Sequence, residues 1–169
     1  MTMTADRERH CPGCTLRMPF DGRAAYDGYY NCSPECWSVY AELLGFEFSN
    51  AVLFGQVHQM SVDSYALQHA GGPHPDKSVA IHLAGLHAAF NLGIRQTQIP
   101  RLLQQLAATV QRWPHFPPPE STGPMTVFDV ALADSLLEHV ARVQKWAGFV
   151  WDSWSDTHRD VASLVRLYG

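Results

Sequence analysis

All four cysteines of the chain lie between Cys11 and Cys36, in the two close pairs CPGC and CSPEC. Thiolates at this spacing reach one tetrahedral ion, and a closed site of sulfur ligands suits Zn²⁺. The pattern therefore predicts one zinc ion held by Cys11, Cys14, Cys32 and Cys36. Because such a ligand set leaves no open position for a substrate, we interpret the ion as a structural one that stabilises the fold.

Turn and helix signals accompany both cysteine pairs. Pro12–Gly13 is a turn that brings the first two sulfurs to one side, and Ser33 followed by Pro34 is a strong helix start. Between them, Asp27–Gly28 predicts the turn of a β-hairpin whose arms lie within residues 23–31. A knuckle, a hairpin and a helix that carries the second pair together predict a treble-clef zinc finger.

This part of the chain resembles the TRASH and YHS group of treble-clef fingers. Members of that group also show two early cysteines, an aromatic hairpin with Asp-Gly, and a Cys-Ser-Pro helix start. The resemblance implies either metal binding for trafficking or a structural and contact-making role. The matching residues are Cys11, Cys14, Asp27, Gly28, Tyr29, Tyr30, Cys32, Ser33, Pro34 and Cys36.

Charge and composition narrow the classes of function. The chain has 169 residues, a net charge of −4 and only 12 lysines and arginines, which are scattered. That distribution argues against binding of nucleic acid through its phosphates. No apolar run reaches membrane-spanning length, and the polar start of the sequence lacks a signal-peptide core. We therefore expect a cytoplasmic protein that contacts neither nucleic acid nor membrane, in which reduced cysteines favour metal over disulfides.

Apolar periodicity predicts a mainly α-helical chain. We expect the finger to occupy residues 1–45 and to pack on a helical domain, residues 46–169, built as a bundle of roughly five or six helices. Residues 113–124 are rich in proline and should form an irregular loop, and residues 125–131 should be a short extended piece. The predicted helices cover residues 33–44, 57–70, 77–92, 99–113 and 133–168, the last with a break near residue 155.

Nearly the whole chain also resembles an uncharacterised bacterial family that is defined only as a domain of unknown function. Besides the cysteine pairs, the shared motifs are VHxxxVDxYxxQH at residues 57–69, SVAIHL at residues 78–83, and WAxxVWxxWxxxH at residues 146–158. The resemblance implies no activity, but it indicates which residues belong together.

Nine histidines make a second metal site the most specific further hypothesis. The Gly-Gly-Pro turn at residues 71–73 predicts that the helices before and after it are antiparallel neighbours, which places His69 and His82 at similar levels. With His158 they would form a three-histidine site with an open position, a type used in catalysis. Tyr65 and Asp63 should lie nearby. The alternative is that these are ordinary buried histidines that make hydrogen bonds.

Two classes of function therefore remain open. In the first, the helical domain is a metal-dependent enzyme or a metal sensor, whose histidine-lined pocket takes a second divalent metal ion. In the second, the protein is a non-enzymatic adaptor in protein–protein interactions, and its histidines are structural. The sequence names no catalytic residue, because phosphate-binding glycine loops, HExxH and GxSxG are all missing from it. A protein or a small molecule is the expected partner.

Overall fold

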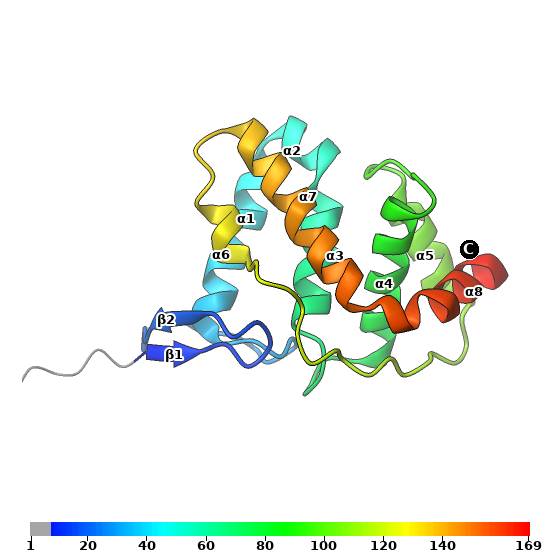
Figure 1. Cartoon of the computed structure of the whole chain (residues 1–169), viewed down its shortest axis with the longest axis horizontal. Coiled ribbons are helices and arrows are strands. Elements are labelled where there is room, and N and C mark those ends of the chain that lie inside the picture. Colours follow the sequence, from blue (N-terminus) through cyan, green and yellow to red (C-terminus); the bar gives the residue numbers. More distant parts are fainter. Residues whose placement is uncertain (1–7) are drawn as a thin grey trace, which may run out of the picture.

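The computed structural model describes residues 8–169 and confirms a mainly helical fold with a short N-terminal β-hairpin (Figure 1). The hairpin lies at one end of the molecule, and the helices form the body beside it. The elements are β1 (Glu8–His10), β2 (Arg17–Pro19), α1 (Pro34–Ser49), α2 (Ala51–Gln56), α3 (His58–Gln68), α4 (Asp76–Phe90), α5 (Ile99–Thr109), α6 (Val127–Ala131), α7 (Leu136–Ser153), a 3₁₀ turn (Ser155–Thr157) and α8 (His158–Tyr168).

The hairpin encloses the first cysteine pair. β1 and β2 pair antiparallel, with Arg9 opposite Met18. The knuckle between them is closed by two backbone hydrogen bonds, from the Cys11 N–H to the Leu16 carbonyl and from the Thr15 N–H to the Cys11 carbonyl. The CPGC turn therefore forms the tip of the hairpin, held between the two paired strands.

The hairpin predicted around Asp27–Gly28 is wrong in position, because residues 20–32 contain no strand. Gly28 does turn the chain, with φ of 82°, and the Asp27 side chain accepts a hydrogen bond from the Tyr29 N–H. The local turn signal is thus genuine, but the arms do not pair. The Tyr30 N–H instead donates to the Tyr26 hydroxyl.

Helix α1 begins as predicted and ends later than predicted. The Ser33 hydroxyl accepts a hydrogen bond from the Cys36 N–H at 3.2 Å, which caps the helix. The helix continues past Gly45 to Ser49 because Leu43 and Glu47 are both buried, so its inner face extends one turn further. The predicted domain boundary between residues 45 and 46 falls inside this helix, and residues 1–7 of the predicted finger lie outside the described part of the chain.

Helix α3 lies in the middle of the molecule. It packs against α1, α4 and α7, and the contact with α4 is the most extensive of these (Figure 1). Its buried residues include Ser61, Asp63, Ser64 and Gln68, so polar side chains point into the core rather than to solvent. Such groups need hydrogen-bond partners inside the protein. Helix α3 is therefore a candidate source of functional residues.

The remaining helices form close to their predicted positions, with two exceptions. Residues 127–131 form helix α6 instead of an extended piece, because Thr126 and Asp129 make a reciprocal capping box. A short helix, α2, also forms in the predicted connector, where the Asn50 side chain caps its start. No helix within residues 8–169 combines the length and apolar character needed to cross a membrane.

Candidate metal centre

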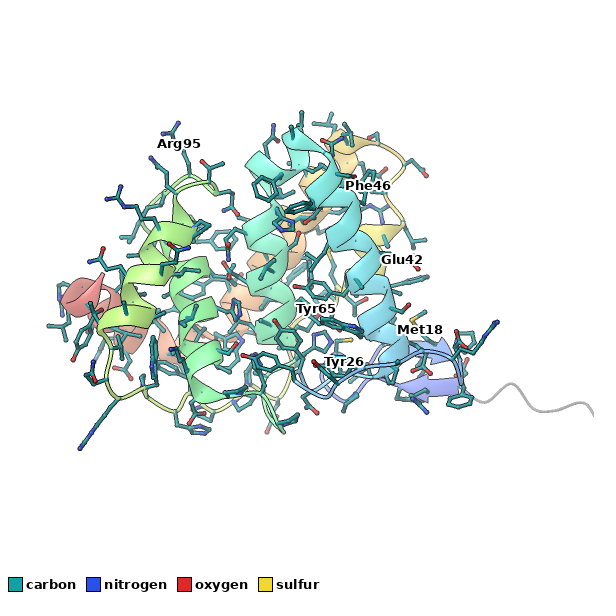
Figure 2. The ribbon with its side chains drawn as sticks, turned by 180° about the vertical axis from the view of Figure 1, so that it is seen from behind. Met18, Tyr26, Glu42, Phe46, Tyr65 and Arg95 are labelled. Atoms are coloured by element: carbon teal, nitrogen blue, oxygen red, sulfur yellow. The ribbon has the colours of Figure 1, made fainter. Side chains whose placement is uncertain are left out.

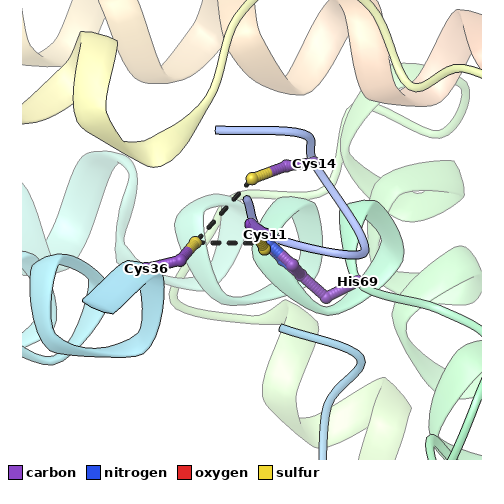
Figure 3. Close-up of side chains that lie close together, drawn as sticks. All are labelled: Cys11, Cys14, Cys36 and His69. Atoms are coloured by element: carbon purple, nitrogen blue, oxygen red, sulfur yellow. Dashed lines mark hydrogen bonds between the residues drawn. The ribbon is translucent and has the colours of Figure 1, made fainter. Parts of the chain in front are cut away.

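Four potential metal ligands meet where the knuckle, α1 and α3 come together. The ligand atoms of Cys11, Cys14, Cys36 and His69 all lie within 4.8 Å of one another (Figure 3). All four side chains are buried, and those of Cys36 and His69 have no exposed surface. Three chain segments far apart in the sequence thus place three sulfurs and one ring nitrogen around one point.

The histidine ring is oriented for binding. His69 Nδ1–H donates to the Tyr65 carbonyl at 2.7 Å, so the free electron pair is on Nε2, which lies 3.4 Å from Cys36 Sγ. A backbone carbonyl on the far nitrogen is the usual arrangement for a metal-binding histidine. The Cys14 and Cys36 sulfurs are 3.8 Å apart, a separation expected for two ligands of one ion.

Three of the four residues in this cluster, Cys11, Cys14 and Cys36, are among the four cysteines that the sequence predicts as zinc ligands. Cys32 does not belong to the group, and His69 stands in the fourth position. The Cys32 thiol is half-buried beside the Tyr65 and Tyr26 hydroxyls, and burial raises its pKa to about 11. His69 ends the VHxxxVDxYxxQH motif, but nothing in the sequence places it beside the cysteines, and the sequence predicts it instead for a second site with His82 and His158.

Close backbone packing joins the knuckle to the end of α3. The Asn31 N–H donates to the His69 carbonyl at 3.0 Å. A Cβ on Gly13 would lie 2.5 Å from the Asn31 carbonyl oxygen and 2.7 Å from the ring of His69. Only glycine fits there, so the middle of the CPGC turn is shaped to receive the histidine.

Without a bound ion, the three clustered thiols of Cys11, Cys14 and Cys36 do not all ionise. Hydrogen bonds from the Cys14 and Cys36 thiols lower the pKa of Cys11. The hydrogen bond that Cys14 donates to Cys11 raises the Cys14 pKa to about 12, and hydrogen bonds to both other thiols, together with burial, raise the Cys36 pKa. The cluster alone therefore favours a single thiolate, whereas a bound divalent ion would deprotonate all its thiol ligands.

Aromatic rings enclose the centre on the α1 and α3 side. Tyr65 stacks on Tyr40 with ring centroids 3.7 Å apart, and its hydroxyl donates to Cys36 Sγ at 3.5 Å (Figure 2 labels Tyr65). Tyr30 packs edge-on against Tyr65. Such a hydrogen bond supports a thiolate ligand, and the surrounding rings keep water away from it.

The three histidines predicted for a second metal site do not come together. His69 belongs to the cysteine cluster, whereas His82 Nδ1–H donates to Asp63 Oδ1 at 2.8 Å. His158 lies flat on Trp151, with centroids 3.7 Å apart, and bonds to that residue's carbonyl. In residues 8–169, the cluster of Cys11, Cys14, Cys36 and His69 is the single group of three or more such ligands within reach of one ion.

Asp63 orients a histidine on another helix, His82 on α4. Its Oδ1 accepts hydrogen bonds from His82 and from Gln59. Its Oδ2 has no partner among the described residues and faces the backbone of Gly85 on α4. Burial raises the Asp63 pKa, although the contact with His82 opposes that effect.

A second buried carboxylate links three helices. Glu47 on α1 accepts hydrogen bonds from His139 Nε2 at 2.8 Å, Ser61 Oγ at 2.6 Å and His58 Nδ1 at 3.1 Å. Burial alone would raise the Glu47 pKa, but these three hydrogen bonds outweigh burial and lower it. The carboxylate is therefore ionised at neutral pH and ties α1 to α3 and α7.

We expect Glu47→Gln to lower the free energy of unfolding by about 3 kcal/mol at neutral pH, because it breaks a buried charged network. The lowered pKa of Glu47 means that its stabilising effect is complete above the pKa of an unfolded glutamate, about 4.3, and disappears as the pH falls through the lower folded value. Denaturant unfolding of both proteins at several pH values measures this difference. It should shrink in acid, and a difference that stays constant contradicts the assignment. Glu42→Gln, on the exposed side of the same helix, is the control.

Comparison with known sequences assigns the chain to a family. No curated protein and no solved structure matches it. The sequence model described as "Family of unknown function (DUF5946)" matches residues 9–155, a range that contains all four residues of the cysteine and histidine cluster. The chain therefore belongs to this family of unknown function.

Proposed function

We propose that the protein binds one Zn²⁺ through Cys11, Cys14, Cys36 and His69. The observation that carries the proposal is the convergence of four buried ligand atoms within 4.8 Å. Three cysteines and one histidine form a common ligand set of structural zinc sites, and soft thiolates favour zinc over calcium or magnesium. This set replaces the four-cysteine set that the sequence predicts.

The role that we propose for the ion is to fasten the N-terminal segment to the helical body. Residues 15–32 include no fully buried residue, and among their apolar side chains only Leu16, Tyr30 and Cys32 pack partly on the core. The ion would join the cysteines before and after the segment to His69, which belongs to the helical body. The ion would thus add to the limited cohesion that the segment's own side chains supply.

We infer that the protein works as a non-enzymatic binding protein, the adaptor class. Four protein ligands leave no position on the ion for a substrate, which argues against metal-dependent catalysis at this centre. The exposed aromatic residues Phe46, Phe48 and Phe54 near the end of α1 and on α2 provide apolar surface of the kind that interaction sites use.

Metal analysis of single variants tests the ligand set. Protein purified without chelators should contain about one zinc per chain, and Cys11→Ser, Cys14→Ser, Cys36→Ser and His69→Ala should each lose most of it. Cys32→Ser is the matched control and should keep it. Cobalt substitution gives an independent readout, because its visible spectrum distinguishes three sulfur ligands from four. Zinc-free wild type rejects the proposal, and loss of zinc in Cys32→Ser but not in His69→Ala restores the four-cysteine site.

A further inference from the structure

A cavity of about 360 Å³ opens between α1 and the chain that runs from β2 to residue 24. Glu35, Val39 and Glu42 line it from α1, where their spacing puts them on one face of the helix. Met18 and Asp21 line it from the other wall (Figure 2 labels Met18 and Glu42). Three carboxylates thus line one cavity, and no cationic side chain among residues 8–169 does so. The volume is at the lower end of the range for small-molecule sites.

The Glu35 carboxylate is buried in this cavity with an incomplete set of partners. Its side chain is only 2% exposed. Oε1 accepts a hydrogen bond from the Asp21 N–H at 3.1 Å, so the carboxylate lies where the two walls meet. Oε2 has no hydrogen-bond partner among the described residues. The start of α1 favours a negative charge at Glu35, but it leaves Oε2 without a donor, and buried polar atoms of this kind call for one.

Two arginines lie near these carboxylates, but each makes only a loose ion pair with them. Arg9 Nη1 is 3.6 Å from Glu35 Oε1, and the Arg9 guanidinium lies over the Phe20 ring. Arg23 Nε is 3.6 Å from Asp21 Oδ1, and the Arg23 side chain is 96% exposed. Both separations are too long for a hydrogen bond, and exposed pairs of this kind contribute little. The cavity therefore keeps a net negative charge that a cationic ligand would match.

We propose that the cavity binds an alkylguanidinium group, the group that an arginine side chain carries. Within residues 8–169, the carboxylates of Asp21, Glu35 and Glu42 do not come close enough together to share one metal ion. A guanidinium has five N–H donors around a planar group, so it reaches carboxylates that lie apart. Its alkyl stem would lie on Val39 and Met18, which are apolar parts of the lining. The proposal concerns a site separate from the metal centre.

Methyl-resolved NMR of the full-length protein, as purified, tests this site with n-butylguanidinium, n-butylammonium and 1-butanol as probes. We expect n-butylguanidinium to shift the methyl signals of Met18, Ala24 and Val39 with a dissociation constant on the order of 1 mM. The ammonium compound should bind about fivefold more weakly, because it has fewer donors for separated carboxylates, and the alcohol should not bind. No saturable shift with n-butylguanidinium, or equally tight binding of either other probe, overturns the proposal.

A short peptide separates two sources of the guanidinium group. Acetyl-Gly-Arg-Gly-amide presents an arginine side chain as a partner protein would, whereas n-butylguanidinium represents a free compound. Binding of both supports an arginine of a partner protein as the occupant. Binding of n-butylguanidinium alone supports a free small molecule.

Single variants separate the contributions of charge and shape. Glu35→Gln should weaken n-butylguanidinium binding about tenfold, because it removes a buried charged acceptor, and Glu42→Gln about threefold, because that carboxylate is exposed. Ala24→Leu should fill the cavity and abolish binding. Glu120→Gln, at an exposed glutamate on the proline-rich loop, is the control and should bind like wild type. The metal content of each variant is measured as well, so that loss of this site is distinguished from loss of the metal. Unchanged binding in both Glu35→Gln and Ala24→Leu also overturns the proposal.

Discussion

Removal of the metal ion is expected to unfold the segment from Glu8 to Ser33 while most of the helical body keeps its secondary structure. Zinc binding contributes about 10–16 kcal/mol in small zinc domains, against a net stability of about 5–15 kcal/mol for most domains. Residues 15–32 include no buried residue that would replace this contribution. Helix α1, in contrast, also packs on α2, α3 and α6.

Hydrogen exchange before and after chelation measures this effect at each segment. Amides of the knuckle and of residues 15–32 should lose protection, those of α4 and α7 should keep most of theirs, and added zinc should restore the pattern. Far-UV circular dichroism should show only a modest loss of helix. An apo protein with verified zero metal content and unchanged exchange in residues 8–33 contradicts the structural role.

Gly85→Ala is expected to destabilise the protein by about 3 kcal/mol, although alanine is the better helix former. A Cβ at this position would overlap Asp63, lying 2.6 Å from its Cγ and closer still to its Oδ2. Asp63 is fully buried and bonded to His82 and Gln59, so it cannot move without leaving polar atoms unpaired. Chemical denaturation of the zinc-loaded protein measures the change.

Two further variants test whether the overlap of the new Cβ with Asp63 causes this loss of stability. Gly45→Ala in α1, where an added Cβ meets nothing within 4 Å, should stabilise the protein by about 0.5–1 kcal/mol. Asp63→Ala removes the side chain that Gly85 faces, so adding Gly85→Ala to it should cost little further stability. A Gly85→Ala protein that is as stable as wild type contradicts the close packing of α3 on α4.

The cysteine pairs and most helices were predictable because their signals are local. The CPGC turn, the Ser33 cap and the apolar periodicity each act over a few neighbouring residues. His69 was not predictable as a ligand of this centre, because it is 33 residues from Cys36 and its place depends on how α3 packs. Sequence spacing also made Cys32 look equivalent to Cys36, whereas the geometry of the helix start separates them.

Predictions also failed where a local preference met a tertiary constraint. Asp27–Gly28 turns the chain, but the strands pair around the knuckle instead. The helix predicted over residues 57–70 forms, yet polar residues on it are turned inward: Asp63 bonds to His82 on α4, and Gln68 accepts from Trp146 Nε1 on α7. These partners lie far away in the sequence, so single-helix periodicity carries no information about them.

The positions of the four ligands bear on the order in which the chain is assembled during translation. All of them lie within residues 11–69, so the complete set of ligand residues is synthesised before α4 to α8. At ~5–20 residues per second, the ribosome needs on the order of ten seconds to add residues 70–169. In that interval the zinc ion that we propose can join the knuckle, α1 and α3, so that the later helices dock on a nucleus whose arrangement is already set.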